Sequence, residues 1–330
     1  MLTILGYGAA LPARIVTNDE LATMVDTSDE WIVSKTGIKT RRVCVDETLT
    51  DLAYSAACEA LQRSSTDPGD LGLIVCSTIC GDFTSPSLAC CVAERLGVSV
   101  PAFDVNAACA GFLYAINAAA AQIALQTKIK SNFDGSAHGD SKKRILIISA
   151  EMLSKHTDWT DRNTCVLFGD GAGAVVAEPG GGLRYIKTYC FPNREVLYKA
   201  DATSSPFASY DIPRGYLRMD GQRVFKFAVS KVGEMLDGMM NSMSLTPNDI
   251  DYFVLHQANK RIIDSARLRL NLPEDKFPTN IERYGNMSSA CVPILLSEMW
   301  EKGMLKKGVR LFMSAFGAGL TAACCYYVCD

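Results

Sequence analysis

One cysteine, Cys109, has a position that suggests chemistry. It lies in the stretch AFDVNAACAGFLYAINAAAAQIALQ (102–126), where an extended apolar run turns into a long alanine-rich helix. Cysteine is often only a small core residue, and this chain has 13 of them. At the first turn of a helix, however, unpaired backbone N–H groups and the helix dipole favour the thiolate, which is the nucleophilic form. Cys109 is therefore a candidate nucleophile.

A cysteine that transfers an acyl group needs a base or donor nearby and groups that stabilise the developing oxyanion. Of the three histidines, His138 lies in a polar segment, His156 lies in LSKHTDWTDR, and His256 ends the apolar strand YFVL. Asn286 opens a second apolar helix, where asparagine is also a common N-cap. The segment FGAGL places glycines on both sides of Ala318, so backbone N–H groups there are able to approach a carbonyl oxygen.

The elements that must position these residues occur twice along the chain. In the same order, three stretches have a later counterpart: TDPGDLGLIVCST and LTPNDIDYFVLHQ, NAACAGFLYAI and NMSSACVPILL, RILIISA and RLFMSA. They predict two α/β halves, residues 1–177 and 178–330, with helices covering the sheets. In such a pair the helices that begin near Cys109 and Asn286 converge, and His256 lies at a strand end on the same side.

Composition limits the function classes. The 330 residues are 48% hydrophobic and 21% charged, and the formal net charge of −3 gives no overall attraction to nucleic acid or to an anionic membrane. The amino-terminal residues lack a basic signal-peptide region, so we expect a cytoplasmic protein. The cysteines show no C-x-x-C or Cys/His spacing, which favours reduced thiols and no metal site. The polar stretch 127–143 is predicted to be a surface loop.

Six stretches together resemble one family. DVNAACAGF, VLHQANKRI, YGNMSSACVPI, FGAGLT, SDEWIVSKTGI and TDRNTCVLFGDGAGAVV strongly resemble the β-ketoacyl-acyl-carrier-protein synthases III, and the likeness covers nearly the whole chain. The resemblance implies an α/β thiolase-like fold, a layered α-β-α-β-α sandwich of two duplicated halves, which is usually a homodimer. It implies decarboxylating Claisen condensation of an acyl-CoA primer with malonyl-acyl carrier protein, which initiates fatty acid synthesis.

The resemblance also implies roles for individual residues. Cys109 would be the acylated nucleophile, while His256 and Asn286 would promote decarboxylation of the malonyl thioester by donating hydrogen bonds to the enolate oxygen. The backbone N–H groups of Cys109 and Ala318 would form the oxyanion hole of acylation. No metal or redox cofactor is required, because the coenzyme A thioester is a substrate.

Substrate contacts carry over in the same way. Coenzyme A would meet Trp31 and Arg162, which are suited to clamp the adenine, and Asn259 in the pantetheine tunnel. Lys35 stands where an arginine is common, and lysine lacks the planar fork. The acidic carrier protein would dock on a basic cluster: Lys226, Lys260, Arg261, Arg267 and Arg269.

The acyl pocket is the last feature that the resemblance addresses. In the family, the loop represented here by GDFTSPSLACC reaches across the dimer interface to the end of the partner's pocket. Thr84 and Ser85 occupy the position where a bulky side chain would restrict the primer, so the pocket is predicted to admit more than acetyl. Phe83 is the alternative residue to close it.

Three other functions compete with fatty acid initiation. A relative of the same fold acting in secondary metabolism, of the polyketide or quinolone type, would share the same catalytic motifs. A papain-like protease also has the chain order Cys, His, Asn, but the duplicated halves and the absence of a C-G-S-C-W context argue against it. A non-catalytic scaffold would be expected to have lost the nucleophile, and Cys109, His256 and Asn286 are all present.

Overall fold

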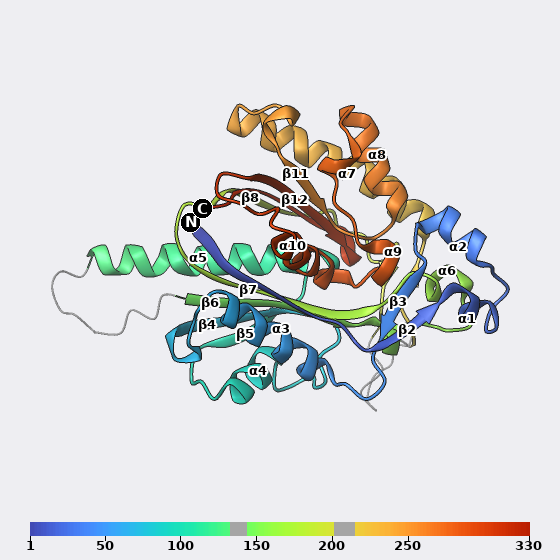
Figure 1. Cartoon of the computed structure of the whole chain (residues 1–330), viewed down its shortest axis with the longest axis horizontal. Helices are drawn as coiled ribbons and strands as arrows, with labels where there is room; N and C mark the ends of the chain where they lie inside the picture. The colour runs from blue at the N-terminus through green and yellow to red at the C-terminus, as the bar shows by residue number, and fades with distance from the viewer. Residues whose placement is uncertain (133–143, 201–214) are drawn as a thin grey trace, which may run out of the picture.

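A computed structural model describes residues 1–132, 144–200 and 215–330, and places most of them in two β-sheets with helices on their faces (Figure 1). The first sheet has the strand order β1 (Leu2–Ala10), β7 (Asp170–Pro179), β6 (Arg144–Met152), β4 (Leu71–Ser77) and β5 (Ala102–Val105). The second has the order β8 (Leu183–Cys190), β13 (Thr321–Val328), β12 (Arg310–Gly317) and β11 (Tyr252–Leu255).

Strand directions repeat between the two sheets. In the first, β1, β7 and β6 are antiparallel neighbours and β6 is parallel to β4. In the second, β8, β13 and β12 are antiparallel neighbours and β12 is parallel to β11. The chain passes from one sheet to the other between Pro179 and Leu183. The division into halves at residues 177 and 178 stays a prediction.

Helices form three layers around the sheets (Figure 1). Helices α5 (Gly111–Asn132) and α10 (Cys291–Glu301) lie between them, and their apolar side chains share one core cluster with both sheets. Helices α3 (Leu49–Arg63) and α4 (Leu88–Leu96) cover the outer face of the first sheet. Helices α7 (Gly221–Met243) and α8 (Lys260–Leu270) cover the outer face of the second. The expected layered α-β-α-β-α sandwich is confirmed.

The central strands are apolar on both faces because each sheet is covered by helices on both sides. In β6, Ile145 and Ile147 pack into the central cluster, while Leu146 and Ile148 pack against the outer helices. This alternation follows from the two-residue period of a strand, and continuous apolar runs are typical of sheets buried on both sides.

Helix α5 is apolar over most of its circumference because both sheets contact it. Judged by length and composition alone, the stretch Ala108–Leu125 is long and apolar enough to cross a membrane. More than half of that stretch is buried inside the protein, and Phe112, Leu113 and Ile116 belong to the central core. Helix α5 continues to Asn132, so the prediction of a loop from residue 127 is wrong for 127–132, and residues 133–143 lie outside the described residues.

Smaller elements gather mainly at the ends of the sandwich. Short helices, two two-stranded ribbons (β2–β3 and β9–β10) and 3-10 turns connect the main elements of the described residues. Their bounds are α1 (Asn18–Ala22), α2 (Asp29–Thr36), β2 (Arg14–Thr17), β3 (Thr40–Val43), α6 (Arg162–Cys165), α9 (Ile281–Tyr284), β9 (Leu197–Tyr198), β10 (Arg218–Met219), η1 (Pro68–Asp70), η3 (Leu153–His156), η4 (Pro247–Asp249) and η5 (Glu274–Lys276). Of these, α1, α2, α6 and the β2–β3 ribbon cluster at one end, on the right in Figure 1.

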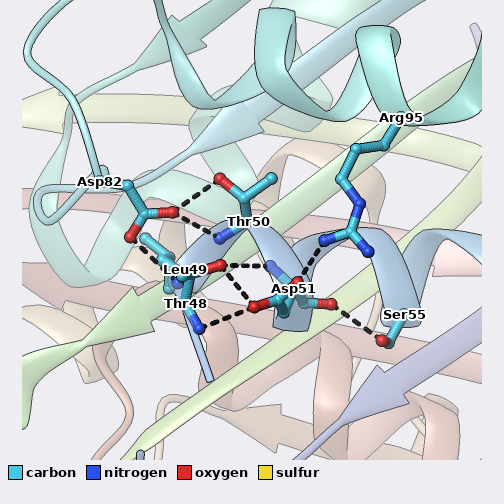
Figure 2. Close-up of polar contacts among 7 residues, drawn as sticks. All are labelled: Thr48, Leu49, Thr50, Asp51, Ser55, Asp82 and Arg95. Atoms are coloured by element: carbon cyan, nitrogen blue, oxygen red, sulfur yellow. Dashed lines mark hydrogen bonds and ion pairs between the residues drawn. The ribbon is translucent and has the colours of Figure 1, made fainter. Parts of the chain in front are cut away.

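The loop that follows β4 is hydrogen-bonded to the amino end of α3. Thr48 and Asp51 form a reciprocal capping box, and Asp82 accepts hydrogen bonds from the backbone N–H groups of Leu49 (3.1 Å) and Thr50 (2.8 Å) (Figure 2). A carboxylate at a helix amino end satisfies unpaired donors and complements the dipole. Arg95 of α4 pairs with Asp51, so the loop and both outer helices are joined at one point.

Candidate active site

Cys109 lies in a short turn with unusual backbone geometry. The turn is η2 (Ala108–Ala110), which runs directly into α5, and Ala108 has a φ of 47°. The corresponding turn of the second half, η6 (Ser288–Ala290), runs into α10, and Ser288 has a φ of 50°. Positive φ in a non-glycine residue is uncommon and is typical of functional sites. The two turns pack against each other, as the duplicated sequence pattern predicted.

His256 follows β11 directly, with its side chain 2% exposed. Its backbone N–H donates to the carbonyl oxygen of Ser314 on β12 (2.9 Å), and its ring packs edge-on against Phe316 (5.4 Å between ring centres). Burial lowers the pKa of His256 to about 3. The imidazole is therefore neutral at physiological pH, with a single ring N–H to donate.

Asn286 precedes η6, and among the described residues its recorded side-chain contacts involve only one end of the amide. Its Oδ1 accepts a hydrogen bond from the backbone N–H of Ser288 (2.8 Å). The N-caps of η6 and α10 are Met287 and Ala290, so Asn286 is not the N-cap considered for it, although its oxygen binds the backbone of the turn. The Nδ2 group remains available as a donor, because the recorded contacts of this side chain fall on Oδ1.

Cys109, His256 and Asn286 meet on the wall of one cavity of about 790 Å³. The nucleophile comes from the first half of the chain and the other two from the second. Ser288 and Ala318 line the same cavity, and apolar side chains such as Val166, Leu217 and Phe225 form much of the remaining wall. A deep, mostly apolar cavity with a few convergent polar groups is typical of a ligand site.

The turn η7 (Ala318–Leu320) approaches Cys109 closely through its neighbour Gly317. A Cβ placed on Gly317 would lie 2.5 Å from the backbone nitrogen of Cys109, so only glycine permits this approach. Ala318 lines the cavity next to it. The backbone N–H groups of Cys109 and Ala318 therefore lie on neighbouring segments, as an oxyanion hole requires.

The charge state of Cys109 differs from the expectation based on the helix terminus. Burial raises the pKa of the Cys109 thiol to about 12, although its interaction with the Ser288 side chain lowers that pKa in part. The favourable helix terminus is outweighed because Cys109 is only partly exposed, on the wall of a mostly apolar cavity where a charge loses much of its hydration. The resting nucleophile is a protonated thiol, and acylation needs an acceptor for its proton.

The predicted adenine clamp is closed in this structure. The Arg162 guanidinium lies 4.8 Å from the centre of the Trp31 ring and donates a hydrogen bond to the carbonyl oxygen of Asp26 (2.9 Å). A planar base between them would need about 7 Å, twice the van der Waals separation of stacked atoms. Trp31 lines the cavity, so a base would enter only after the Arg162 side chain moves.

The other two predicted coenzyme A contacts also line the cavity. Asn259 caps α8, since its Oδ1 accepts from the Arg261 N–H (2.9 Å), and its Nδ2 donates to the Lys35 carbonyl oxygen (3.0 Å). Both ends of this amide therefore already have partners. The Lys35 ammonium is exposed at the rim.

Two of the five basic residues predicted for docking are neutralised by neighbours. Lys260 pairs with Asp264 (2.5 Å) and Glu274 (3.4 Å), and Arg269 pairs with Asp237 (2.6 Å). A paired charge contributes less to the field that a partner protein meets.

The remaining three differ in exposure. Arg267 is half-buried, and its Nε atom has no hydrogen-bond partner within the described chain. Arg261 is exposed at the cavity rim, with its guanidinium 5.2 Å from the centre of the Phe225 ring, and Lys226 is exposed beside that ring on α7. For neither Arg261 nor Lys226 is an ion pair recorded in the described ranges.

The predicted acyl-pocket residues do not line the cavity of their own chain. Thr84 and Ser85 are exposed in the loop that Asp82 anchors, and the Phe83 side chain is 60% exposed. Their role at a partner's pocket stays a prediction.

Sequence reasoning missed three residues of this site. Ser288 and Gly317 lie inside the quoted motifs, but their contacts with Cys109 depend on how the halves pack. Glu151 ends the apolar strand β6 and is completely buried, and a carboxylate at the end of an apolar run was the available signal. Across the described ranges, no three His, Cys, Asp or Glu side chains are grouped as a metal site.

Comparison with known proteins gives consistent matches over the full length. Family models described as 3-oxoacyl-[acyl-carrier-protein] synthase III match residues 134–190 and, for the C-terminal part, 240–329. A β-ketoacyl-[acyl-carrier-protein] synthase III of Clostridium beijerinckii is 41% identical over 331 residues, covering 98% of this chain and 97% of the relative.

Solved structures agree. The structure of the synthase III from Thermus thermophilus is 37% identical with a TM-score of 0.89, covering 99% of both chains. A priming β-ketosynthase from a polyketide pathway is 32% identical with a TM-score of 0.88, covering 100% of this chain and 96% of the other.

Proposed function

The chain belongs to the 3-oxoacyl-[acyl-carrier-protein] synthase III family, and we propose that Cys109, His256 and Asn286 carry its reaction. The family activity is the acyl-transferring condensation that initiates fatty acid synthesis. This assignment rests on one observation: the three side chains line the wall of the same cavity.

In the first half-reaction, the Cys109 sulfur attacks the thioester carbonyl of acyl-CoA. The negative oxygen of the tetrahedral intermediate accepts hydrogen bonds from the backbone N–H groups of Cys109 and Ala318, and the coenzyme A thiolate leaves. Gly317 supports this step because its bare backbone lets η7 approach the Cys109 nitrogen.

In the second half-reaction, malonyl-acyl carrier protein replaces coenzyme A in the cavity. Neutral His256 and the free Nδ2 of Asn286 donate hydrogen bonds to the thioester oxygen, which becomes an enolate oxygen as CO2 leaves. The resulting carbanion attacks the acyl-Cys109 thioester and releases the cysteine. These steps need no metal or redox cofactor.

Coenzyme A binding rests on Trp31, Arg162, Lys35 and Asn259 at the cavity entrance. Arg162 must leave the face of Trp31 for the adenine to stack there. Lys35 then contributes a single mobile charge near the phosphates rather than a planar fork.

The decisive test is reconstitution. Purified protein would receive acetyl-, longer or branched acyl-CoA together with malonyl-acyl carrier protein, and the β-ketoacyl product would be identified by mass. We expect a β-ketoacyl-carrier product and an acyl adduct on Cys109. The absence of an adduct with every acyl-CoA would overturn the assignment. The relative at 41% identity favours fatty acid initiation over the polyketide type, whose priming enzyme is 32% identical.

We also propose that the protein is a homodimer in the cytoplasm. Strand β5 is the edge of the first sheet, where its Phe103 side chain is 41% exposed, and an exposed edge strand is a ready site for pairing. Light scattering of the purified protein would give twice the mass of one chain.

Charge reversal at Arg261 and Lys226 is expected to raise the KM for malonyl-acyl carrier protein. Exposed charges are worth up to about 1 kcal/mol each, which corresponds to about fivefold in KM per residue, and the effect should shrink as salt rises. Steady-state kinetics with malonyl-acyl carrier protein at low and high salt measure it. Arg269→Glu is the control, since Arg269 is ion-paired and lies roughly 12 Å further along α8. If all three substitutions raised the KM equally, Arg261 and Lys226 would not be identified as the docking site.

Ser85→Phe is expected to lower kcat/KM for longer acyl-CoAs more than for acetyl-CoA. Each excluded methylene loses about 0.8 kcal/mol of burial, or about fourfold. Ser85 is exposed on its own chain, so the effect requires a dimer. A panel of acyl-CoA chain lengths, repeated with Phe83→Ala, identifies the residue that limits the pocket. A native enzyme that reacts only with acetyl-CoA would contradict an open pocket.

A further inference from the structure

A buried carboxylate, Glu151, lies behind the candidate nucleophile. It ends β6 and is fully buried beneath η6. Its Oε1 accepts hydrogen bonds from the hydroxyls of Ser288 (3.1 Å) and Ser289 (2.8 Å). Its Oε2 accepts from the Ile79 N–H (3.1 Å) and the Cys80 thiol (2.8 Å). Among the described residues, no ion pair is recorded for this carboxylate.

Ser288 links this carboxylate to the nucleophile. Its hydroxyl donates a hydrogen bond to Glu151 Oε1, and Ser288 lies beside Cys109 on the cavity wall, where the packed turns η2 and η6 bring its side chain to bear on the thiol. A hydroxyl both donates and accepts, so this chain of three groups can carry a proton in either direction. Ser289 touches the same carboxylate oxygen, but its other recorded contact is with the Ser77 carbonyl oxygen (3.5 Å).

We propose that Glu151 takes the proton of Cys109 through Ser288 during acylation and returns it during condensation. This proposal rests on the proposed function. It answers a requirement of the site, since the Cys109 thiol is protonated at rest and neutral His256 lies in a pocket where protonation is unfavourable.

Protons and bonds balance over the two half-reactions. On acylation, the S–H bond of Cys109 breaks, Ser288 accepts that proton and gives its own to Glu151, and the acyl group moves to sulfur as the coenzyme A thiolate departs. On condensation, the C–S bond of acyl-Cys109 breaks, and Glu151 returns the proton through Ser288 to the released thiolate. The coenzyme A thiolate takes one proton from water, which matches the net reaction.

The surroundings suit a group that must change its charge. Burial raises the pKa of Glu151 above that of an ordinary glutamate, while hydrogen bonds from Cys80, Ile79 and the two serines oppose this shift. The other titratable groups that face it are the thiols of Cys80, Cys109 and Cys291, whose pKa values are raised. The Lys155 ammonium, close to Cys80, is bound to the carbonyl oxygens of Cys80 (2.5 Å) and Gly81 (3.2 Å).

The test compares the acylation half-reaction of four proteins by rapid-quench intact-mass measurement: the native chain, Glu151→Gln, Ser288→Ala and Ser289→Ala. Glu151→Gln and Ser288→Ala should slow acylation of Cys109 about 100-fold, while Ser289→Ala stays within about threefold. Alanine is compatible with the backbone of this turn, because Ala108 adopts nearly the same positive φ in the matching turn, and the circular dichroism spectrum of Ser288→Ala should match that of the native chain. Malonyl decarboxylation should persist in Ser288→Ala, since Asn286 binds the backbone rather than the hydroxyl of Ser288.

The pH profile separates a proton relay from a purely structural role. In the native chain, acylation should rise with pH as Glu151 loses its proton and then level off. In Glu151→Gln and Ser288→Ala it should rise in proportion to hydroxide without levelling, because only solvent removes the proton. Native-like rates and profiles in both variants would overturn the relay alone. A native protein that is never acylated on Cys109 would overturn the proposed function instead.

Discussion

Replacing Cys109 by serine is expected to abolish acyl transfer from acyl-CoA, with a loss of at least about 1,000-fold in the acylation rate. Serine has nearly the same shape, but its hydroxyl is a much weaker acid than the thiol, and burial already raises the pKa of that thiol to about 12. A group that is basic enough to take the proton of the Cys109 thiol is therefore not basic enough to take the proton of the serine hydroxyl. Intact-protein mass spectrometry after mixing with acyl-CoA measures the adduct directly.

Cys90→Ser is the matched control for this loss. Cys90 is exposed on α4 and does not line the cavity, so its removal should leave the adduct at full stoichiometry. Peptide mapping of the native protein should place the acyl group on Cys109. A stoichiometric adduct on the serine variant, or on another of the cysteines, would refute the assignment of the nucleophile.

His256→Ala and Asn286→Asp are each expected to suppress malonyl decarboxylation by about 100- to 1,000-fold while leaving acylation measurable. Aspartate keeps the oxygen that accepts from the Ser288 N–H and replaces the Nδ2 donor by an acceptor, so it tests the donor without removing that hydrogen bond. Release of labelled CO2 from malonyl-acyl carrier protein measures this step, and the Cys109 adduct measures the other. Equal losses in both half-reactions would show that the roles are misassigned.

The pH dependence of decarboxylation gives an independent check on His256. Because burial lowers its pKa to about 3, the imidazole is neutral above that pH and becomes protonated only below it. Decarboxylation should therefore show no step near the ordinary histidine pKa of about 6.5 when pH falls from 8 to 5. A step there that disappears in His256→Ala would show that the ring is solvated or charged in the working enzyme.

Local sequence patterns were sufficient for much of the fold. Continuous apolar runs identify strands such as β6 and β12, and the repeated order of motifs predicts equivalent strands and helices in two sheets. The prediction failed at the end of α5, where polar residues 127–132 continue the helix. Their polarity suggested a loop, but extending a helix that has already formed costs much less free energy than nucleating one.

The sequence by itself also determined which side chains are candidates for chemistry, because motifs and spacing record residue types and their places at strand and helix ends. Only the tertiary structure decided their environment. Glu151 and Ser288 are 137 positions apart, and it is their contact that connects a carboxylate to the Cys109 thiol. Likewise, the ion pair of Arg269 with Asp237 joins two helices, whereas Arg261 remains exposed. Burial and partners set pKa and effective charge, and both depend on segments brought together from distant parts of the chain, which no local pattern specifies.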